Sequence, residues 1–312
     1  MKGLNLIGAD KYGYGQKNYA HAINDFLSIP HTYNTYTHIY NTSIYKKEAL
    51  NHILVGLPSY KKPDILTVHD VGFNYPNFVK PKVFAFLLRE NIRRADRIIV
   101  FSRFMKNEIE RFYKNKDITI LPFGFDLGFY TYSVVKAMLM FYEKEYDVLI
   151  VSNLEERKNL LPYLEVLSKT WLKVRLIGKT VDVALSDKIR RLCADSSNIE
   201  YSVSVPDIRV EYAKSRVLLH PSFYGGFEIP IAESSLMNLN TLLYDYPLNR
   251  ELYGNAPNYL PYELPTKEEM EELILKASLS YSSQTMKEIV RRNNDIENII
   301  KGYEKFYEEC LQ

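Results

Sequence analysis

Short apolar runs typical of buried strands alternate with longer amphipathic segments along most of this 312-residue sequence. Successive parallel strands need crossover connections, which are usually helices, so the alternation predicts parallel sheets covered by helices. In the first half we expect strands at Gly3–Gly8, Asp64–His69, Asp96–Phe101 and Ile118–Leu121, and helices at Gln16–Leu27, Pro81–Arg94 and Ser102–Tyr113. In the second half we expect strands at Asp147–Ser152, Lys173–Ile177, Ile199–Tyr201, Val217–His220 and Thr241–Tyr244, and helices at Leu160–Lys169, Asp182–Cys193, Ile208–Lys214 and Ile229–Asn238.

The length of the chain favours two domains, because a single hydrophobic core rarely grows to this size. The alternation is interrupted near 127–146, between the run Pro122-Phe-Gly-Phe-Asp126 and the next strand. We therefore expect an N-terminal Rossmann-like domain over 1–130, a C-terminal Rossmann-like domain over 146–283 and a helical tail over 284–312.

The composition, with 46% hydrophobic and 25% charged residues, is that of a globular protein. Cys193 and Cys310 lie far apart and lack a CxxC spacing, which indicates reduced thiols in a cytoplasmic protein. The apolar run Leu4–Ile7 is short and interrupted by Asn5, so it predicts a strand rather than a signal peptide. No stretch approaches the roughly 20 apolar residues of a membrane-spanning helix.

The net charge of +2 hides an asymmetry between the two halves. Residues 1–130 hold 18 Lys and Arg against 11 Asp and Glu, a balance of +7, which leaves 22 against 27, or −5, for the remainder. A basic first half suits an anionic partner, such as a membrane surface contacted peripherally or an acidic acceptor. An uneven distribution of surface lysines by chance explains the asymmetry equally well. Nucleic acid is not expected as a partner, because no RNA-binding or zinc-ligand pattern accompanies the charge.

The segment His31–Tyr45 interleaves tyrosines with Thr, Asn and His. Aromatic rings on a polar surface can stack on a sugar or lie at a membrane interface, but an edge strand or a surface loop is the simpler interpretation. His31 and His38 lack partners at metal-ligand spacing, so we expect no metal site here.

The run at 220–233 is the most informative about function. It reads His-Pro-Ser-Phe-Tyr-Gly-Gly-Phe-Glu-Ile-Pro-Ile-Ala-Glu and joins an apolar strand to a helix. Gly225 and Gly226 let the backbone approach a ligand without a Cβ in the way, and the helix start behind them offers unpaired N–H groups to a phosphate. The carboxylate of Glu233 can accept hydrogen bonds from a ribose diol.

This run resembles the donor-site motif of the retaining glycosyltransferase family 4, which reads Pro-Ser, two residues, Glu-Gly-Phe-Gly, an apolar residue, Pro, two residues, Glu. The resemblance implies the GT-B fold, in which two Rossmann-like domains face each other across a cleft and a C-terminal helix crosses back to the first domain. It also implies that Glu233 holds the ribose of a nucleotide-sugar. The matching residues are Pro221, Ser222, Gly226, Phe227, Pro230 and Glu233.

Two positions depart from the family motif. Gly225 stands where the family has its first glutamate, which contacts the transferred sugar, and Glu228 stands where the family has a glycine. We hypothesise that Glu228 partly replaces the missing carboxylate by turning toward the sugar. The alternative is that Glu228 only stabilises the helix start, where a carboxylate is favoured by about 0.3–1 kcal/mol. Glu228 and Glu233 are five residues apart, so on a helix they point in different directions.

A second motif, Val151-Ser-Asn-Leu-Glu-Glu-Arg-Lys-Asn159, follows the first strand of the second half. Arg157 and Lys158 suit a diphosphate, and the carboxyl ends of parallel strands are where such sheets bind ligands. The stretch resembles the family segment whose lysine binds the diphosphate. The resemblance implies that role for Lys158, with Arg157 beside it. Many relatives have a further arginine where this chain has Asn153. A solvated charge cluster with the adjoining glutamates is the alternative.

Two first-half motifs complete the resemblance. Thr67-Val-His-Asp70, followed by Pro76, resembles a segment in which the histidine faces the cleft near the sugar, a role that passes to His69, while Asp70 caps the next segment. Gly13 and Gly15 lie in a loop after the first strand, where their N–H groups can approach a phosphate or the acceptor, although a plain turn explains them equally well.

Together these patterns predict a retaining hexosyltransferase that moves a sugar from a GDP- or UDP-sugar to a hydroxyl of a glycan, lipid or protein. The catalytic residues expected are His69, Arg157, Lys158 and Glu228, and the leaving phosphate takes the acceptor's proton. We expect no cofactor and no metal, because no Asp-x-Asp stands beside a suitable strand. The alternative is a degenerate protein that binds nucleotide-sugars without transferring them. The donor-binding residues expected are Gly13, Gly15, Asn153, Arg157, Lys158, Gly225, Gly226, Phe227, Glu228, Ile229 and Glu233.

Overall fold

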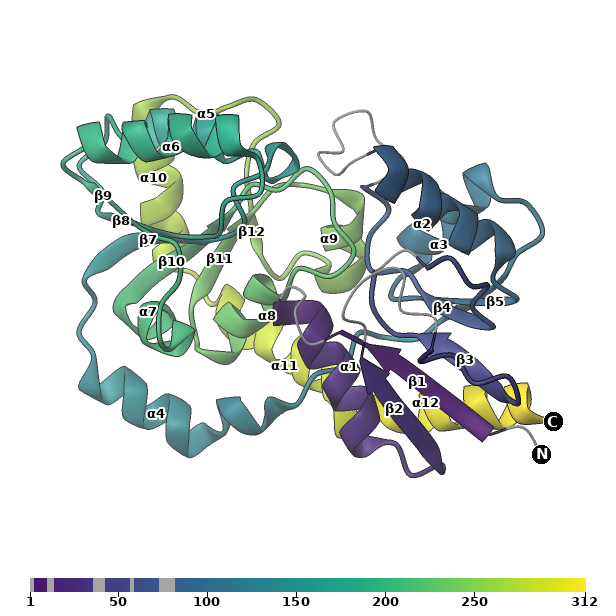
Figure 1. Cartoon of the computed structure of the whole chain (residues 1–312). Helices are drawn as coiled ribbons and strands as arrows, with labels where there is room; N and C mark the ends of the chain where they lie inside the picture. Colours follow the sequence, from purple (N-terminus) through teal and green to yellow (C-terminus); the bar gives the residue numbers. More distant parts are fainter. Residues whose placement is uncertain (1–2, 10–13, 36–42, 57–58, 73–81) are drawn as a thin grey trace. The chain divides into compact units, whose positions relative to one another are not determined.

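The computed structural model describes residues 3–9, 14–35, 43–56, 59–72 and 82–312, and these residues form two compact units (Figure 1). The first unit comprises Met1–Leu127, Gly225–Phe227 and Arg291–Gln312, and the second comprises Gly128–Tyr224 and Glu228–Val290. Each unit is built on a six-stranded sheet whose described strand pairs are all parallel.

The sheet of the first unit has the strand order β2-β1-β3-β4-β5-β6. Its strands are β1 (Gly3–Gly8), β2 (His31–Thr35), β3 (Ala49–Ile53), β4 (Ile65–Thr67), β5 (Arg97–Val100) and β6 (Asp117–Ile120). Its helices are α1 (Tyr14–Phe26), α2 (Lys82–Arg94), α3 (Arg103–Phe112) and α12 (Ile296–Leu311). The hydroxyl of Ser102 accepts a hydrogen bond from the N–H of Met105 and caps α3, as its sequence predicts.

Two strands of this sheet, β2 and β3, do not follow the apolar pattern. Asn5, in the middle of β1, is fully buried and donates to Asn51 Oδ1 on β3 at 2.9 Å. The Asn5 side-chain oxygen accepts from Thr32 and Asn34 on β2. Polar side chains therefore join three neighbouring strands. This explains why, of these three, the apolar pattern predicted β1 alone. β2 is an edge strand, one of the two structures expected for its segment.

The sheet of the second unit has the order β12-β11-β10-β7-β8-β9. Its strands are β7 (Tyr146–Val151), β8 (Val174–Ile177), β9 (Ile199–Ser202), β10 (Ser215–His220), β11 (Asn240–Leu243) and β12 (Asn258–Tyr259). Its helices are α5 (Leu160–Leu167), α6 (Val183–Asp195), α7 (Ile208–Lys214), α8 (Ile229–Leu236), α9 (Pro247–Tyr253), α10 (Lys267–Ser278) and α11 (Ser282–Asn294), the last of which ends in the first unit.

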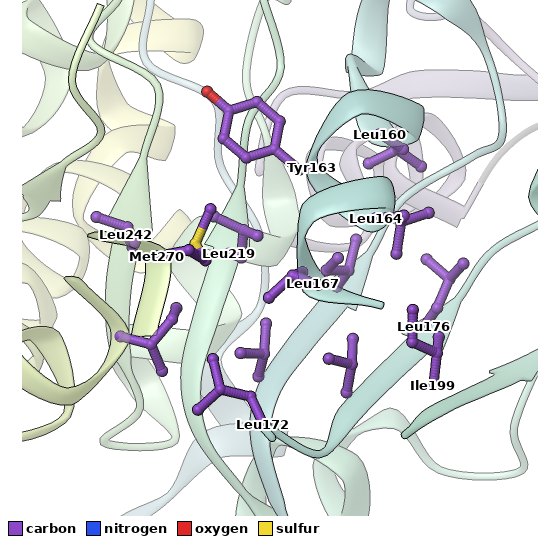
Figure 2. Packing of buried hydrophobic residues seen from close by; sticks show 14 of the residues in the cluster. Leu160, Tyr163, Leu164, Leu167, Leu172, Leu176, Ile199, Leu219, Leu242 and Met270 are labelled. Atoms are coloured by element: carbon purple, nitrogen blue, oxygen red, sulfur yellow. The ribbon is translucent and has the colours of Figure 1, made fainter. Parts of the chain in front are cut away.

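One hydrophobic core holds the second unit together (Figure 2). Leu160, Leu164 and Leu167 of α5 are almost fully buried against the sheet, where they meet Leu176 of β8 and Leu219 of β10. Met270 of α10 closes the same core. Burial of a leucine of this kind contributes roughly 1.5–3 kcal/mol, so this core stabilises the sheet that carries the connections after β7 and β10.

The segment 127–146, which the sequence predicts as a linker, contains a 3₁₀ helix, η2 (Leu127–Tyr130), and the helix α4 (Tyr132–Phe141). The expected helical tail is divided at Asp295, whose side chain accepts from the N–H of Glu297 and caps α12. Within the described ranges, no helix has the length and hydropathy of a membrane span.

Candidate donor site

The chain reverses its direction across the second sheet between β7 and β10. Strands β7, β8 and β9 follow one another toward one edge, whereas β10, β11 and β12 follow one another toward the opposite edge. In open α/β sheets, ligands bind beyond the carboxyl ends of the strands at such a reversal point. The two motifs singled out in this half of the sequence follow β7 and β10, so both lie at this reversal.

The connection after β7 places Lys158. A 3₁₀ helix, η3 (Glu156–Lys158), links β7 to α5, and Asn159 follows with φ of 53° in the left-handed region. Asparagine adopts this conformation more readily than most residues with a side chain, so the left-handed turn accounts for an Asn next to the lysine. The turn leaves Lys158 only 5% exposed at the sheet edge.

The connection after β10 is tied to the one after β7. The N–H of Phe223 donates to the carbonyl of Arg157 at 3.0 Å, and Nη1 of Arg157 donates to the carbonyl of Tyr224 at 3.1 Å. The two connections therefore lie side by side. Arg157 has a further ionic partner, Glu155, at 2.7 Å from its Nη2.

The centre of the site is an ion pair between Lys158 and Glu228. The Lys158 ammonium donates to both carboxylate oxygens of Glu228, at 2.6 and 2.7 Å, and Arg157 Nη1 lies 3.6 Å from Oε1. Burial raises the pKa of Glu228, but the charges of Lys158 and Arg157 outweigh it and hold this pKa well below its usual range. Burial and the charge of Arg157 lower the pKa of Lys158, while Glu228 opposes that shift.

Glu228 is the N-cap of α8, but its side chain makes no capping hydrogen bond. The helix begins at Ile229, as the sequence predicts, so Glu228 directly precedes its first turn. A charged hydrogen bond to an ammonium is worth more than one to a neutral backbone N–H, which explains why the carboxylate turns to Lys158 rather than to the helix.

His220, the last residue of β10, joins this cluster although its sequence pattern indicated no role for it. Its Nε2 lies 3.5 Å from Glu228 Oε2, and this nitrogen has no hydrogen-bond partner of good geometry among the described residues. Burial lowers the pKa of His220, while the carboxylate of Glu228 opposes that shift. Its position directly before the Pro-Ser of the motif was the one available sequence signal.

Glu233 lies one turn and a half into α8 in a separate polar pocket. Tyr130 of η2 donates to its Oε1 at 2.7 Å and Tyr212 of α7 donates to its Oε2 at 3.0 Å. Burial raises the pKa of Glu233 to about 7, against the lowering effect of these two hydrogen bonds. Nothing in the sequence marked Tyr130 or Tyr212 as partners of this carboxylate. Glu228 and Glu233 thus have different partners, in keeping with their spacing.

The other predicted donor residues of the second half lie on the connections that follow β7 and β10. Asn153 is exposed just after β7, and Ile229 is the first residue of α8. Gly225, Gly226 and Phe227 lie in the loop between β10 and α8. Their roles stay predictions.

The predicted residues of the first half are only partly described. Gly13 and Pro76 lie outside the described residues. The expected loop position of Gly15 is wrong, because Gly15 is in the first turn of α1. His69 is buried to 8% exposure, and its Nε2 donates to the carbonyl of Leu54 at 2.6 Å. Asp70 accepts from the N–H of Gly72, as expected of a residue that caps the following segment. The sugar contact assigned to His69 stays a prediction.

The described part of the chain has no group of three or more His, Cys, Asp or Glu side chains arranged to hold a metal ion. What the site does offer is two cationic side chains, each paired with a carboxylate of the chain, beside the start of a helix at one sheet edge. This arrangement can bind a phosphate-bearing ligand and stabilise negative charge on it.

Comparison with known proteins gives one relative by sequence and several by structure. The chain is 27% identical over 211 residues to the O-antigen chain mannosyltransferase RfbU of Salmonella typhimurium strain LT2; the match covers 62% of this chain and 56% of that relative. The chain thus spans just over half the length of the curated relative it matches. No family model matches the chain.

Among solved structures, Alr3699/HepE of Anabaena in complex with UDP-glucose aligns over 99% of this chain and all of its own, with a TM-score of 0.71 and 11% identity. Sucrose-phosphate synthase of Thermosynechococcus elongatus aligns over 84% of this chain and 73% of its own, with a TM-score of 0.66 and 15% identity. The pneumococcal O-GlcNAc transferase GtfA, in complex with UDP and GlcNAc, aligns over 96% of this chain and 61% of its own, with a TM-score of 0.59 and 14% identity. These similarities, with two parallel six-stranded sheets, confirm the predicted two-domain α/β fold of the GT-B type.

Proposed function

We propose that this chain is a glycosyltransferase that moves a hexose from a nucleotide-diphosphate-sugar to an acceptor hydroxyl, with retention of the anomeric configuration and without a metal ion. The observation that carries the proposal is the position of Lys158 and Arg157. They lie at the reversal point of a parallel sheet, beside the start of α8, where this architecture binds phosphates.

The similar proteins support the choice of donor class. RfbU is named a mannosyltransferase, Alr3699/HepE was crystallised with UDP-glucose and GtfA with UDP and GlcNAc. These activities and bound ligands are properties of the similar proteins. For this chain we propose a UDP- or GDP-sugar as donor and a hydroxyl of a glycan, lipid or protein as acceptor.

Lys158 and Arg157 bind the diphosphate in this proposal, with help from the backbone amides of Gly225, Gly226 and Phe227. As the bond between the anomeric carbon and the phosphate oxygen breaks, negative charge grows on the diphosphate. Fixed cations and amides at that place stabilise it without reorganising. The acceptor oxygen forms the new bond on the same face of the sugar, and its proton passes to the leaving phosphate oxygen. Glu228 accepts a hydrogen bond from the sugar.

Glu233 binds the ribose diol in this proposal. A carboxylate oxygen can accept two hydrogen bonds, so the bonds from Tyr130 and Tyr212 leave a further acceptor site on each oxygen. The two tyrosines also fix the carboxylate in one orientation. Replacing Glu233 with Ala should therefore weaken the binding of a nucleoside diphosphate.

A thermal-shift panel of UDP, GDP and their hexose conjugates tests the donor class. Ligand at a hundred times its Kd stabilises the folded state by about 2.7 kcal/mol, so a true donor raises the melting temperature. Lys158→Ala should cost about 1.5–3 kcal/mol of diphosphate binding, measured by calorimetry. Lys276→Ala, on the exposed face of α10, is the matched control and should bind normally.

Lys158→Ala leaves Glu228 without its main partner, so the double variant Lys158→Ala/Glu228→Gln separates lost binding from lost folding. Absence of binding by every nucleotide in the panel would refute the donor class. Incubation of the wild-type chain with the donor that binds, followed by assay for free nucleoside diphosphate and glycosylated acceptor, then separates an enzyme from a protein that only binds the donor.

A further inference from the structure

The Lys158 ammonium is already engaged by an anion that belongs to the chain itself. Glu228 accepts two short hydrogen bonds from Lys158, and the Lys158 side chain is 6% exposed against 14% for Glu228. Arg157 Nη1 lies 3.6 Å away and His220 Nε2 lies 3.5 Å away from the same carboxylate. Three nitrogen-bearing side chains from two strand ends therefore converge on one carboxylate.

The carboxylate of Glu228 has the surroundings that a phosphate would need. It stands at the N-terminus of α8, which receives no hydrogen bond from a capping side chain, and it faces a lysine and an arginine. A diphosphate placed on Lys158 would bring about two more negative charges beside Glu228. Two like charges 4 Å apart repel by about 4 kcal/mol in surroundings of intermediate polarity. The carboxylate and the diphosphate thus compete for Lys158.

We propose that Glu228 is an internal anion that occupies Lys158 when the site is empty and is displaced by the diphosphate of the donor. This inference rests on the function proposed above. Binding of the donor is then an exchange of anions at Lys158: the phosphate takes the ammonium, and the carboxylate is released to another hydrogen-bond donor.

The exchange has two physical consequences. In the empty site it keeps the buried ammonium paired, which avoids the several kcal/mol that an isolated buried charge costs. After transfer, the returning carboxylate competes with the nucleoside diphosphate for Lys158 and speeds its dissociation. Glu228 therefore weakens the binding of the free diphosphate. In return it stabilises the empty site and speeds the release of the product.

Replacement of an ordinary binding residue weakens the binding of the nucleotide, whereas replacement of Glu228 should strengthen it. Glu228→Gln keeps the shape of the side chain and removes its charge, so UDP or GDP, whichever the wild type binds, should bind about tenfold more tightly, or 1.4 kcal/mol. The dissociation rate of that nucleotide, measured by stopped flow, should fall in parallel. A residue with a purely structural role would leave this rate unchanged.

Two further variants serve as controls for the affinity of Glu228→Gln for the nucleotide, measured by calorimetric titration. Glu165→Gln, on the exposed face of α5, removes the same charge from the same unit away from the cluster, and should leave binding within twofold of the wild type. Where Glu228→Gln fails to fold, Glu228→Asp keeps the charge on a shorter side chain, and should also bind the nucleotide more tightly than the wild type.

Equal or weaker nucleotide binding by the Glu228 variants, with the wild type binding normally, would overturn the exchange. A tighter Glu165→Gln would also overturn it, because the effect would then reflect net charge alone. Failure of the wild type and all variants to bind any nucleotide would instead refute the proposed function, so the two failures are distinguishable.

Discussion

Each unit buries a group of polar side chains, and the two groups differ in charge. In the first unit, the fully buried His52 on β3 bonds through Nδ1 to the hydroxyl of Tyr307 at 2.7 Å and through Nε2 to that of Thr67 at 2.8 Å. Tyr303, on the same helix as Tyr307, donates to the carbonyl of Pro122 at 2.9 Å. Burial keeps these groups neutral, and they attach α12 to the sheet of the first unit.

In the second unit, the buried groups are acids and bases. Lys158 and Glu228 form an ion pair, and Glu233 is a carboxylate held by two hydroxyls. Neutral hydrogen bonds that satisfy every partner suit a permanent attachment. Charged groups near a sheet edge retain a strong attraction for an incoming ion. Burial of polar groups thus serves the architecture in one unit and, on our proposal, ligand exchange in the other.

The largest effect that tests this comparison concerns His52. Burial lowers its pKa to about 3, and the neighbouring His69 adds to that shift. An unfolded chain with the ordinary pKa of 6.5 binds more protons, so the free energy of unfolding should fall as the pH drops from 6.5 to 3. The fall is about 1.4 kcal/mol per pH unit, on the order of 5 kcal/mol in all. Denaturant unfolding between pH 7 and pH 4 measures this slope, and His52→Gln should flatten it.

Tyr307→Phe is the control for the His52 prediction. It removes the hydroxyl bonded to Nδ1, so it should lower stability by about 1–3 kcal/mol at every pH while it retains the acid slope of the imidazole. An unchanged slope in His52→Gln would show that His52 is not the buried base we infer.

The second effect has the opposite dependence on pH. Burial raises the pKa of Glu233 to about 7, so between pH 4.5 and 7 the folded chain holds a proton that the unfolded chain has lost. The free energy of unfolding should therefore fall as the pH rises through this window, by about 3 kcal/mol in total. Glu233→Gln should remove this loss and be more stable than the wild type at pH 7.5, although it weakens nucleotide binding.

Tyr212→Phe serves as the matched variant for Glu233. It removes one hydrogen bond but keeps the carboxylate, so the stability loss with rising pH should persist. If Glu233→Gln is less stable than the wild type at pH 7.5, the carboxylate is ionised and well satisfied in the folded chain, and the predicted loss of stability with rising pH is wrong.

The sequence predicted the parts of this architecture that depend on apolar pattern. The central strands of the second unit, such as β7 and β10, are largely apolar, so the pattern of residues located these strands and their carboxyl ends, while the resemblance to a family singled out the motifs that follow them. For the segment that contains β2 the sequence left an edge strand or a loop open, and β3 was not predicted, because polar side chains that bond to Asn5 of β1 stand where apolar ones would mark a buried strand.

The site was predictable only where its residues are close in sequence or lie in a motif. Lys158 and Glu228 were both singled out, but their direct pairing across 70 positions was not, because the pattern indicates strand ends and not side-chain directions. Tyr130 is 103 positions from Glu233 and lies in a segment interpreted as a linker. A tyrosine in such a segment has no periodicity that would distinguish it from a surface ring.

The smallest expected effect concerns the left-handed turn at Asn159, which follows Lys158 directly. Asn159 has a φ of 53°, where a residue with a Cβ is disfavoured by about 1–2 kcal/mol and Asn less so. Asn159→Ala should therefore destabilise the chain by about 1 kcal/mol, whereas Asn159→Gly should be nearly neutral because glycine takes this conformation freely. Calorimetric titration should show slightly weaker binding of the nucleoside diphosphate for the alanine variant and unchanged binding for the glycine variant. Equal stability of the two variants would mean that the left-handed turn does not hold Lys158 in place, and that the ion pair with Glu228 positions it alone.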